Sequence, residues 1–137
     1  MNSNVGYVPK TDDEFLLDTA LARTAVEEAI LRHAGYLKEV PGYNEMVKVQ
    51  YGKDLQDIKA VIGTGGVFHY GNNPLEILKG VQYQPKNLAS LKPINPDYYV
   101  DSGYVMYGMG LLSEHYPTQA LRIMKKSLKN LATSIKN

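Results

Sequence analysis

The chain has 137 residues, of which 44% are hydrophobic and 21% are charged, a size and composition typical of one globular domain or a piece of one. The net charge of +1 excludes the basic surface of a nucleic-acid-binding domain, and the absence of cysteine excludes disulfides and cysteine-based zinc sites. No apolar run approaches the roughly 20 residues of a membrane span, so a cytoplasmic location is expected.

Residues 11–34 are predicted to form a long helix. Thr11 and Glu14 have capping-box spacing, and Gly35 is the expected stop. One face carries residues at helical spacing that we expect to be buried, namely Phe15, Thr19, Ala22, Val26, Ala29, Ile30 and His33. A second set widens the apolar surface, namely Leu16, Leu21, Ala25 and Leu31. The helix is therefore expected to be covered on more than one side.

The rest of the chain alternates short strands and helices. The expected elements are a hairpin over residues 36–51, a buried strand over 59–62, a broken helix over 66–81 that restarts at Pro74, a loop over 82–96, a strand over 97–100, a helix over 103–115 capped by Asp101 or Ser102, and a helix over 117–130. This order predicts an α/β fold with a small mixed sheet flanked by helices. Because the strands are few, we expect an incomplete sheet, a fragment of a longer protein, and association into dimers or larger species.

The chain is organised around residues 61–67, where an apolar strand ends at Gly63-Thr64-Gly65-Gly66 before a helix. Glycine can take positive φ and leaves the backbone N–H groups bare, an arrangement that suits phosphates. The segment fits neither the P-loop nor the dinucleotide-binding signature. A plain strand-to-helix turn without a ligand therefore stays open as the alternative.

The other polar candidates are weaker. His69 lies within a few residues of the glycine turn and is the imidazole best placed for a ligand, whereas we expect a structural role for His33 and a helix-ending role for His115. Asp97 and Asp101 could pair around a metal or water, although cap and turn roles are favoured. The histidine spacing does not suit a metal and no nucleophile–base pair is recognisable, so the sequence assigns no catalytic and no metal-binding residue.

Several motifs together resemble a known family. RHAG at 32–35, QYGKDL at 50–55 and VIGTGG at 61–66 occur in that order, with LKP at 91–93 and YGMGLL at 107–112. They resemble the C-terminal part of the methylaspartate (glutamate) mutase accessory proteins, the GlmL or MutL family, which is unrelated to the MutL of mismatch repair. The resemblance runs from about residue 9 to residue 130.

The resemblance implies a fold and a ligand. The family is similar to the actin, Hsp70 and sugar-kinase ATPases, in which two ribonuclease-H-like lobes surround ATP. Residues 11–137 would be a single fragment of the second lobe, after a disordered start that the sequence itself predicts over residues 1–10. Gly63, Thr64, Gly65 and Gly66 would lie against the α-phosphate and adenosine of ATP or ADP, with Arg32 towards the adenine. His69 joins these candidates because it is close to the turn in sequence. Magnesium would be bound mainly by the missing lobe, and no cofactor would be covalently bound.

The resemblance also implies a role and a partner. The intact parent would be an ATPase that serves as a reactivating chaperone for an adenosylcobalamin-dependent mutase, and this fragment alone would not be catalytic. Two alternatives stay open. The chain could be half of an actin-like-fold kinase for small molecules, or a non-catalytic interaction module whose surface is rich in tyrosine, of which the chain has 11.

Overall fold

The computed structural model describes residues 8–131, so most of the expected disordered start, and the last six residues, lie outside the described residues. The chain has a mixed α/β fold with a two-stranded and a three-stranded sheet flanked by helices. Its elements are α1 (Asp12–His33), β1 (Tyr36–Pro41), β2 (Met46–Tyr51), β3 (Ala60–Gly63), α2 (Gly66–Tyr70), α3 (Pro74–Leu78), η1 (Lys79–Val81), β4 (Asp97–Asp101), α4 (Met106–Leu112), α5 (Pro117–Ser127) and β5 (Leu128–Asn130). No helix in the described part is long and apolar enough to cross a membrane.

Helix α1 begins and ends for different reasons. The Thr11 hydroxyl accepts the Glu14 N–H at 3.3 Å and the Glu14 carboxylate accepts the Thr11 N–H at 3.1 Å, which confirms the predicted capping box. After Ala34 the backbone becomes extended. Only glycine fits at position 35, because a Cβ there would lie 2.3 Å from the carbonyl oxygen of Tyr51.

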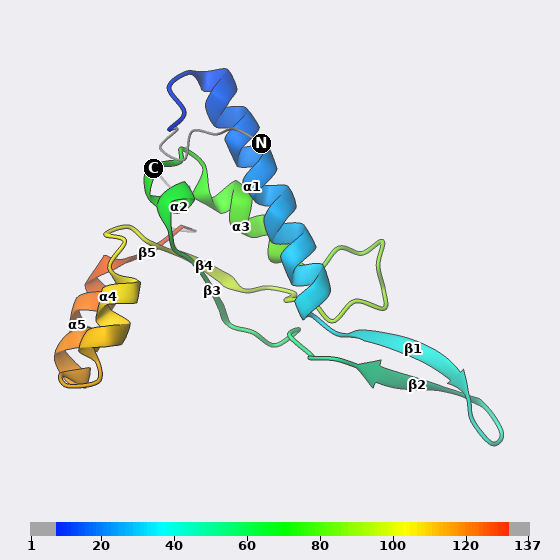
Figure 1. Cartoon of the computed structure of the whole chain (residues 1–137). Coiled ribbons are helices and arrows are strands. Elements are labelled where there is room, and N and C mark those ends of the chain that lie inside the picture. The colour runs from blue at the N-terminus through cyan, green and yellow to red at the C-terminus, as the bar shows by residue number, and fades with distance from the viewer. Residues whose placement is uncertain (1–7, 132–137) are drawn as a thin grey trace.

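Helix α1 is covered on one side only. Its partly buried face includes Phe15, Val26 and Ile30, as expected, but Ala29 and His33 are exposed. The prediction of cover on a second side is wrong for residues 8–131, where the following side chains are exposed: Leu16, Leu21, Ala25 and Leu31. The reason is that α1 packs against a single layer, formed by α3 and η1 (Figure 1).

The predicted hairpin is confirmed and projects away from the helices (Figure 1). Strands β1 and β2 pair antiparallel from Tyr36 opposite Tyr51 to Pro41 opposite Met46, and the rings of Tyr36 and Tyr51 stack 5.5 Å apart. The base of the hairpin is joined to the loop before β4. The Leu37 N–H donates to the Ala89 carbonyl at 2.7 Å.

The three-stranded sheet has the order β3-β4-β5, with β3 parallel and β5 antiparallel to β4. The core lies between this sheet and α3, and its buried members are Leu78, Val81, Tyr98, Val100 and Leu131. The prediction of a fully buried strand at β3 is wrong in the described structure. Strand β3 is at the edge of the sheet, and its Ile62 side chain, which alternates with inward-facing Val61, is 41% exposed.

The last predicted helix ends earlier than expected. Helix α5 stops at Ser127, and Leu128–Asn130 forms β5 against β4 instead of a further helical turn. The backbone N–H and the hydroxyl of Ser102 both donate to the Ser127 carbonyl, at 3.1 and 2.8 Å. These bonds give that carbonyl partners outside the helix. Helix α4 is likewise shorter than the predicted 103–115 span.

Candidate functional site

The glycine turn and Asp101, the last residue of β4, lie at the same edge of the sheet. Strands β3 and β4 are parallel, and Gly63 is paired with Val100, so Thr64 lies beside Asp101 at the end of β4. In open α/β sheets, ligands bind outside the carboxyl ends of parallel strands. This edge is therefore the candidate site.

The turn itself is open on its outer side. Gly65 has φ 106° and ψ 172°, a region available essentially to glycine only, and a Cβ there would meet nothing within 4 Å. At Gly66 the nearest atom to such a Cβ is a ring carbon of Tyr70, 3.9 Å away. Within residues 8–131, the N–H groups of Thr64, Gly65 and Gly66 donate to no carbonyl. The turn thus offers unused donors beside free space.

Gly63 has a different role, because a Cβ there would lie 2.8 Å from the Phe68 ring. The absence of a side chain at Gly63 lets Phe68 pack against the end of β3, and Phe68 in turn packs against the core. Gly63 therefore holds the turn against the sheet, whereas Gly65 and Gly66 form its open part.

The buried side chain of Asp101 holds the glycine turn in place through a hydrogen bond to Thr64. Its carboxylate is 1% exposed and accepts hydrogen bonds from the Ser127 hydroxyl at 2.5 Å, the Met106 N–H at 2.8 Å and the Thr64 hydroxyl at 3.1 Å. Burial raises the pKa of Asp101, but hydrogen bonds from Ser127, Met106, Val105 and Thr64 outweigh burial and hold the pKa below its ordinary value. Asp101 thus accepts the first N–H of α4, but the N-cap residue of that helix is Val105 and not Asp101 or Ser102 as predicted.

The contact of Asp101 with Thr64 was not foreseen from the sequence. A signal for it exists, because an acidic residue ends a strand that runs parallel to the one ending in the glycine turn. That signal becomes usable only when the pairing of the two strands is known.

His69 reaches the same edge from α2. Its Nδ1 lies 3.0 Å from the Ser102 carbonyl oxygen, which can only accept, so Nδ1 carries a proton and, in the neutral ring, Nε2 is left as an acceptor. The ring meets Tyr70 edge-on at 4.6 Å and stacks near Tyr104 at 6.2 Å. Tyr104 has φ 51° and is 53% exposed. The structure therefore brings His69 and Tyr104 together beside the turn.

Other predicted residues lie elsewhere. Arg32 is in the last turn of α1, 3.8 Å from Glu28, near the start of β1 and away from α2 (Figure 1). Asp97 and Asp101 lie at opposite ends of β4, about 13 Å apart at the strand rise, so the alternative in which they pair around a metal is wrong. His115 is exposed between α4 and α5. Residues 8–131 contain no group of three or more acidic and histidine side chains that could hold a metal.

A parallel strand pair with a glycine turn at its carboxyl edge is an arrangement typical of α/β proteins that bind ligands at that edge. The chain belongs to the MutL protein family, whose family model matches residues 1–128. It is similar to the curated "Protein MutL" of Clostridium tetanomorphum, with 42% identity over 125 residues that cover 91% of this chain. The chain spans 27% of the length of that relative. No solved structure matches the chain.

Proposed function

We propose that this chain is part of a cytoplasmic, ATP-dependent accessory protein that reactivates an adenosylcobalamin-dependent mutase such as glutamate mutase. In this proposal the chain is a fragment of the second lobe of an actin-like ATPase, and residues 63–66 hold the phosphate and adenosine of ATP or ADP. Family membership supports the mutase as the partner. The observation that carries the nucleotide role is the open main chain at Gly65 and Gly66, whose N–H groups are unused within the described residues.

The turn residues fit a phosphate group. A phosphate oxygen accepts several hydrogen bonds at once, and a run of backbone N–H groups forms a concave donor site for it. The Asp101 carboxylate does not compete for the N–H groups of the turn, because it is buried and accepts from its own donors. Hydrolysis of the bound ATP would supply the free energy that moves the lobes. The catalytic groups for hydrolysis would lie outside this chain.

The flat rings beside the turn fit a base. His69 and Tyr104 lie near one another at the same edge, and Tyr104 is largely exposed. Aromatic side chains provide stacking surfaces for nucleobases. We therefore include Tyr104 and His69 in the proposed nucleotide site. Arg32 is left out of it, because α1 ends near the start of β1 and away from the turn (Figure 1).

Titration of ADP, followed by calorimetry and by amide shifts, tests the nucleotide role. We expect saturable shifts at Thr64, Gly65, Gly66 and His69, and Gly66→Leu should weaken binding about tenfold or more, because its side chain occupies the open space. The matched control is Gly110→Leu, a helical glycine whose Cβ would also meet nothing within 4 Å. It should leave binding unchanged.

Equal ADP binding by the Gly66→Leu variant and the unaltered chain would dismiss the turn as the nucleotide site. The partner is tested separately, by ATP-dependent recovery of cobalamin-inactivated mutase with the full-length accessory protein that carries the same substitution. Recovery that is independent of ATP would contradict the proposed chaperone role.

A further inference from the structure

Positive and negative charge are separated on this chain, although its net charge is only +1. Helix α1 carries six acidic residues and two arginines. Residues 103–131, which include α4 and α5, carry four lysine or arginine residues and one acidic residue. Figure 1 shows that α4 and α5 lie apart from α1. The chain therefore has an acidic helix on one side and a basic pair of helices on another.

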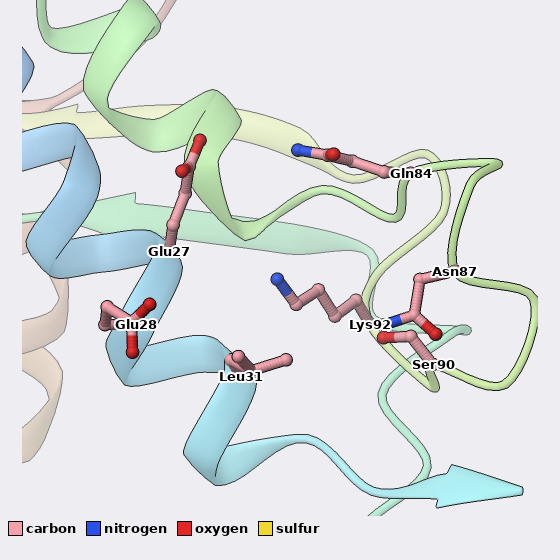
Figure 2. Close-up of a pocket in the computed structure, with 7 residues that line it drawn as sticks. All are labelled: Glu27, Glu28, Leu31, Gln84, Asn87, Ser90 and Lys92. Atoms are coloured by element: carbon pink, nitrogen blue, oxygen red, sulfur yellow. The ribbon is translucent and has the colours of Figure 1, made fainter.

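The acidic surface of α1 is not neutralised by the chain around it. Lys92 extends towards α1 from the loop before β4, but the carboxylates of Glu27 and Glu28 are turned away from its ammonium (Figure 2). Within residues 8–131, Asp13 and Asp18 make no ion pair. These two carboxylates are thus available to a cation from outside the described chain.

The outer face of α1 places these carboxylates beside exposed leucines. Leu17 and Leu21 are 61% and 62% exposed and lie about one helical turn apart. Asp13 precedes Leu17 by four residues and Asp18 precedes Leu21 by three, so each carboxylate neighbours a leucine on the helix surface. Helix α1 therefore presents an apolar ridge accompanied by negative charge.

An open hollow lies between α4 and α5 and has a volume of about 260 Å³. Helix α4 and the residue after it line one side, with Met106, Met109, Gly110 and Ser113. Helix α5 lines the other side, with Pro117, Ala120, Leu121 and Met124. Both sets have the i, i+3, i+4, i+7 spacing of one helix face. Two largely apolar helix faces therefore meet at an open seam, which is the shape that receives a third helix.

The lining suits apolar side chains. The Ser113 hydroxyl donates to the Gly110 carbonyl at 2.6 Å, so its proton is already used. A Cβ at Gly110 would meet nothing within 4 Å, so free space reaches the backbone of α4. Methionine side chains are flexible and fill irregular gaps, and three of them line the hollow. The lining can thus adjust to leucine side chains that enter it.

Positive charge lies at the margin of this hollow. Lys125 follows Leu121 by four residues and Arg122 by three, so the two cations form a row on α5 next to the lining. Both side chains are exposed, and in the described part of the chain neither makes an ion pair. The charge at this margin is opposite to that beside the leucines of α1.

We propose that the hollow between α4 and α5 binds helix α1 of a second copy of this chain. The two exposed leucines enter the hollow, and the carboxylates beside them lie opposite Arg122 and Lys125. The leucines are about 6 Å apart along α1, which fits within the roughly 10 Å between residues 117 and 124 of α5. Apolar burial supplies affinity, and complementary charge selects the partner and its orientation. Because the two surfaces differ, the contact is heterologous and can repeat from copy to copy.

Light scattering over a concentration series of the full 137-residue chain tests the hollow. Gly110→Leu places a side chain in the hollow and should raise the dissociation constant of self-association about tenfold or more. The matched control is Gly108→Leu, in the same helix, where a Cβ also meets nothing within 4 Å but the residue does not line the hollow. It should leave association unchanged. Gly66→Leu, at the proposed nucleotide site, should also leave it unchanged, so the two proposals fail separately.

Charge reversal tests whether the two surfaces meet each other. Arg122→Glu with Lys125→Glu should weaken association about tenfold, and Asp13→Lys with Asp18→Lys should do the same, because each pair places like charges at the contact. An equimolar mixture of the two reversed proteins should associate again, since the lysines of one face the glutamates of the other. Circular dichroism checks that each variant keeps its helices.

The proposal is overturned if the unaltered chain is a monomer at every concentration. It is also overturned if folded Gly110→Leu and the folded α5 charge-reversed protein associate as the unaltered chain does, which would place the contact between two α1 helices or elsewhere. A mixture of the folded charge-reversed proteins that stays monomeric would likewise overturn it.

Discussion

Asp101 connects three segments that are far apart in the chain. Its carboxylate accepts from Thr64 after β3, from Met106 at the start of α4 and from Ser127 at the end of α5. Hydrogen bonds to a charged group contribute about 1.5–3 kcal/mol each, more than neutral ones. The geometry of the glycine turn therefore depends on one ionised side chain.

We predict that Asp101→Asn lowers the free energy of unfolding at neutral pH by about 2–3 kcal/mol, because the charge-assisted bonds are lost. The pH dependence should also change. The Asp101 pKa is lower in the folded chain than its ordinary value of 3.8, so the folded state binds fewer protons and the carboxylate contributes stability above that value. That contribution is lost as the pH falls through 3.8 towards the folded pKa, and it is absent from the variant.

Urea denaturation of both proteins between neutral and acidic pH measures this effect. Their difference in unfolding free energy should stay constant above about pH 5 and shrink below it. Asp97→Asn, at the exposed opposite end of β4, serves as the control and should stay within about 0.5 kcal/mol of the unaltered chain. A difference between Asp101→Asn and the unaltered chain that does not shrink at low pH would contradict the ionised state of Asp101.

At the scale of elements, main chain approaches main chain closely at a glycine where α1 joins the hairpin. A Cβ at Gly35 would lie 2.3 Å from the Tyr51 carbonyl oxygen and 2.9 Å from the Lys53 nitrogen, both backbone atoms that cannot move separately from β2 and the turn after it. The hairpin and α1 therefore cannot tolerate a side chain at their junction.

We predict that Gly35→Ala lowers the free energy of unfolding by about 1–3 kcal/mol through this overpacking, measured by thermal or urea denaturation. The control is Gly110→Ala, in α4, where a Cβ meets nothing within 4 Å. That change should raise stability by about 0.5–1 kcal/mol, as expected for a helical glycine. Equal effects of the two substitutions would show that the junction is looser than described.

Several elements were predicted correctly because each is determined by residues close to it in the chain. The capping box of α1, the hairpin turn after Pro41 and the helix restart at Pro74 are all set by residues within a few positions. The end of α5 was missed because Leu128 continues the apolar period of that helix. Its Ser127 carbonyl accepts from Ser102 and its hydroxyl donates to Asp101 at the end of β4, which no local pattern reveals.

The parts of the candidate site also differ in how far the sequence predicts them. The glycine turn was predictable from residues 61–67 alone, since strand and turn are contiguous. The placement of Asp101 beneath it requires the parallel pairing of β3 with β4.

At the scale of the whole molecule, apolar surface is exposed on two sides. The outer face of α1 carries Leu17 and Leu21, which are 61% and 62% exposed. The face of the sheet opposite α3 includes Ile62, which is 41% exposed. Parallel strands are almost always covered on both faces, so the described residues form an incomplete layer arrangement. This agrees with a chain that spans 27% of its relative.

We predict that the chain forms dimers or larger species in multi-angle light scattering at high concentration, because exposed apolar surface associates. The double variant Leu17→Glu and Leu21→Glu should shift it towards the monomer. Ala20→Glu with Thr24→Glu places the same charges at exposed positions of α1 without removing a leucine, and should keep the association. A monomer at every concentration for the unaltered chain would contradict the prediction.

The hydrogen bond between Ser127 and Asp101 couples the glycine turn to the end of α5, more than sixty residues later in the chain. A protease that cut before Ser127 would remove one donor to Asp101 and the strand β5 that lies beside β4. The carboxylate would then be left with fewer partners and less cover, and its hold on Thr64 would weaken. Loss of Ser127 and β5 is therefore expected to loosen the glycine turn through Asp101.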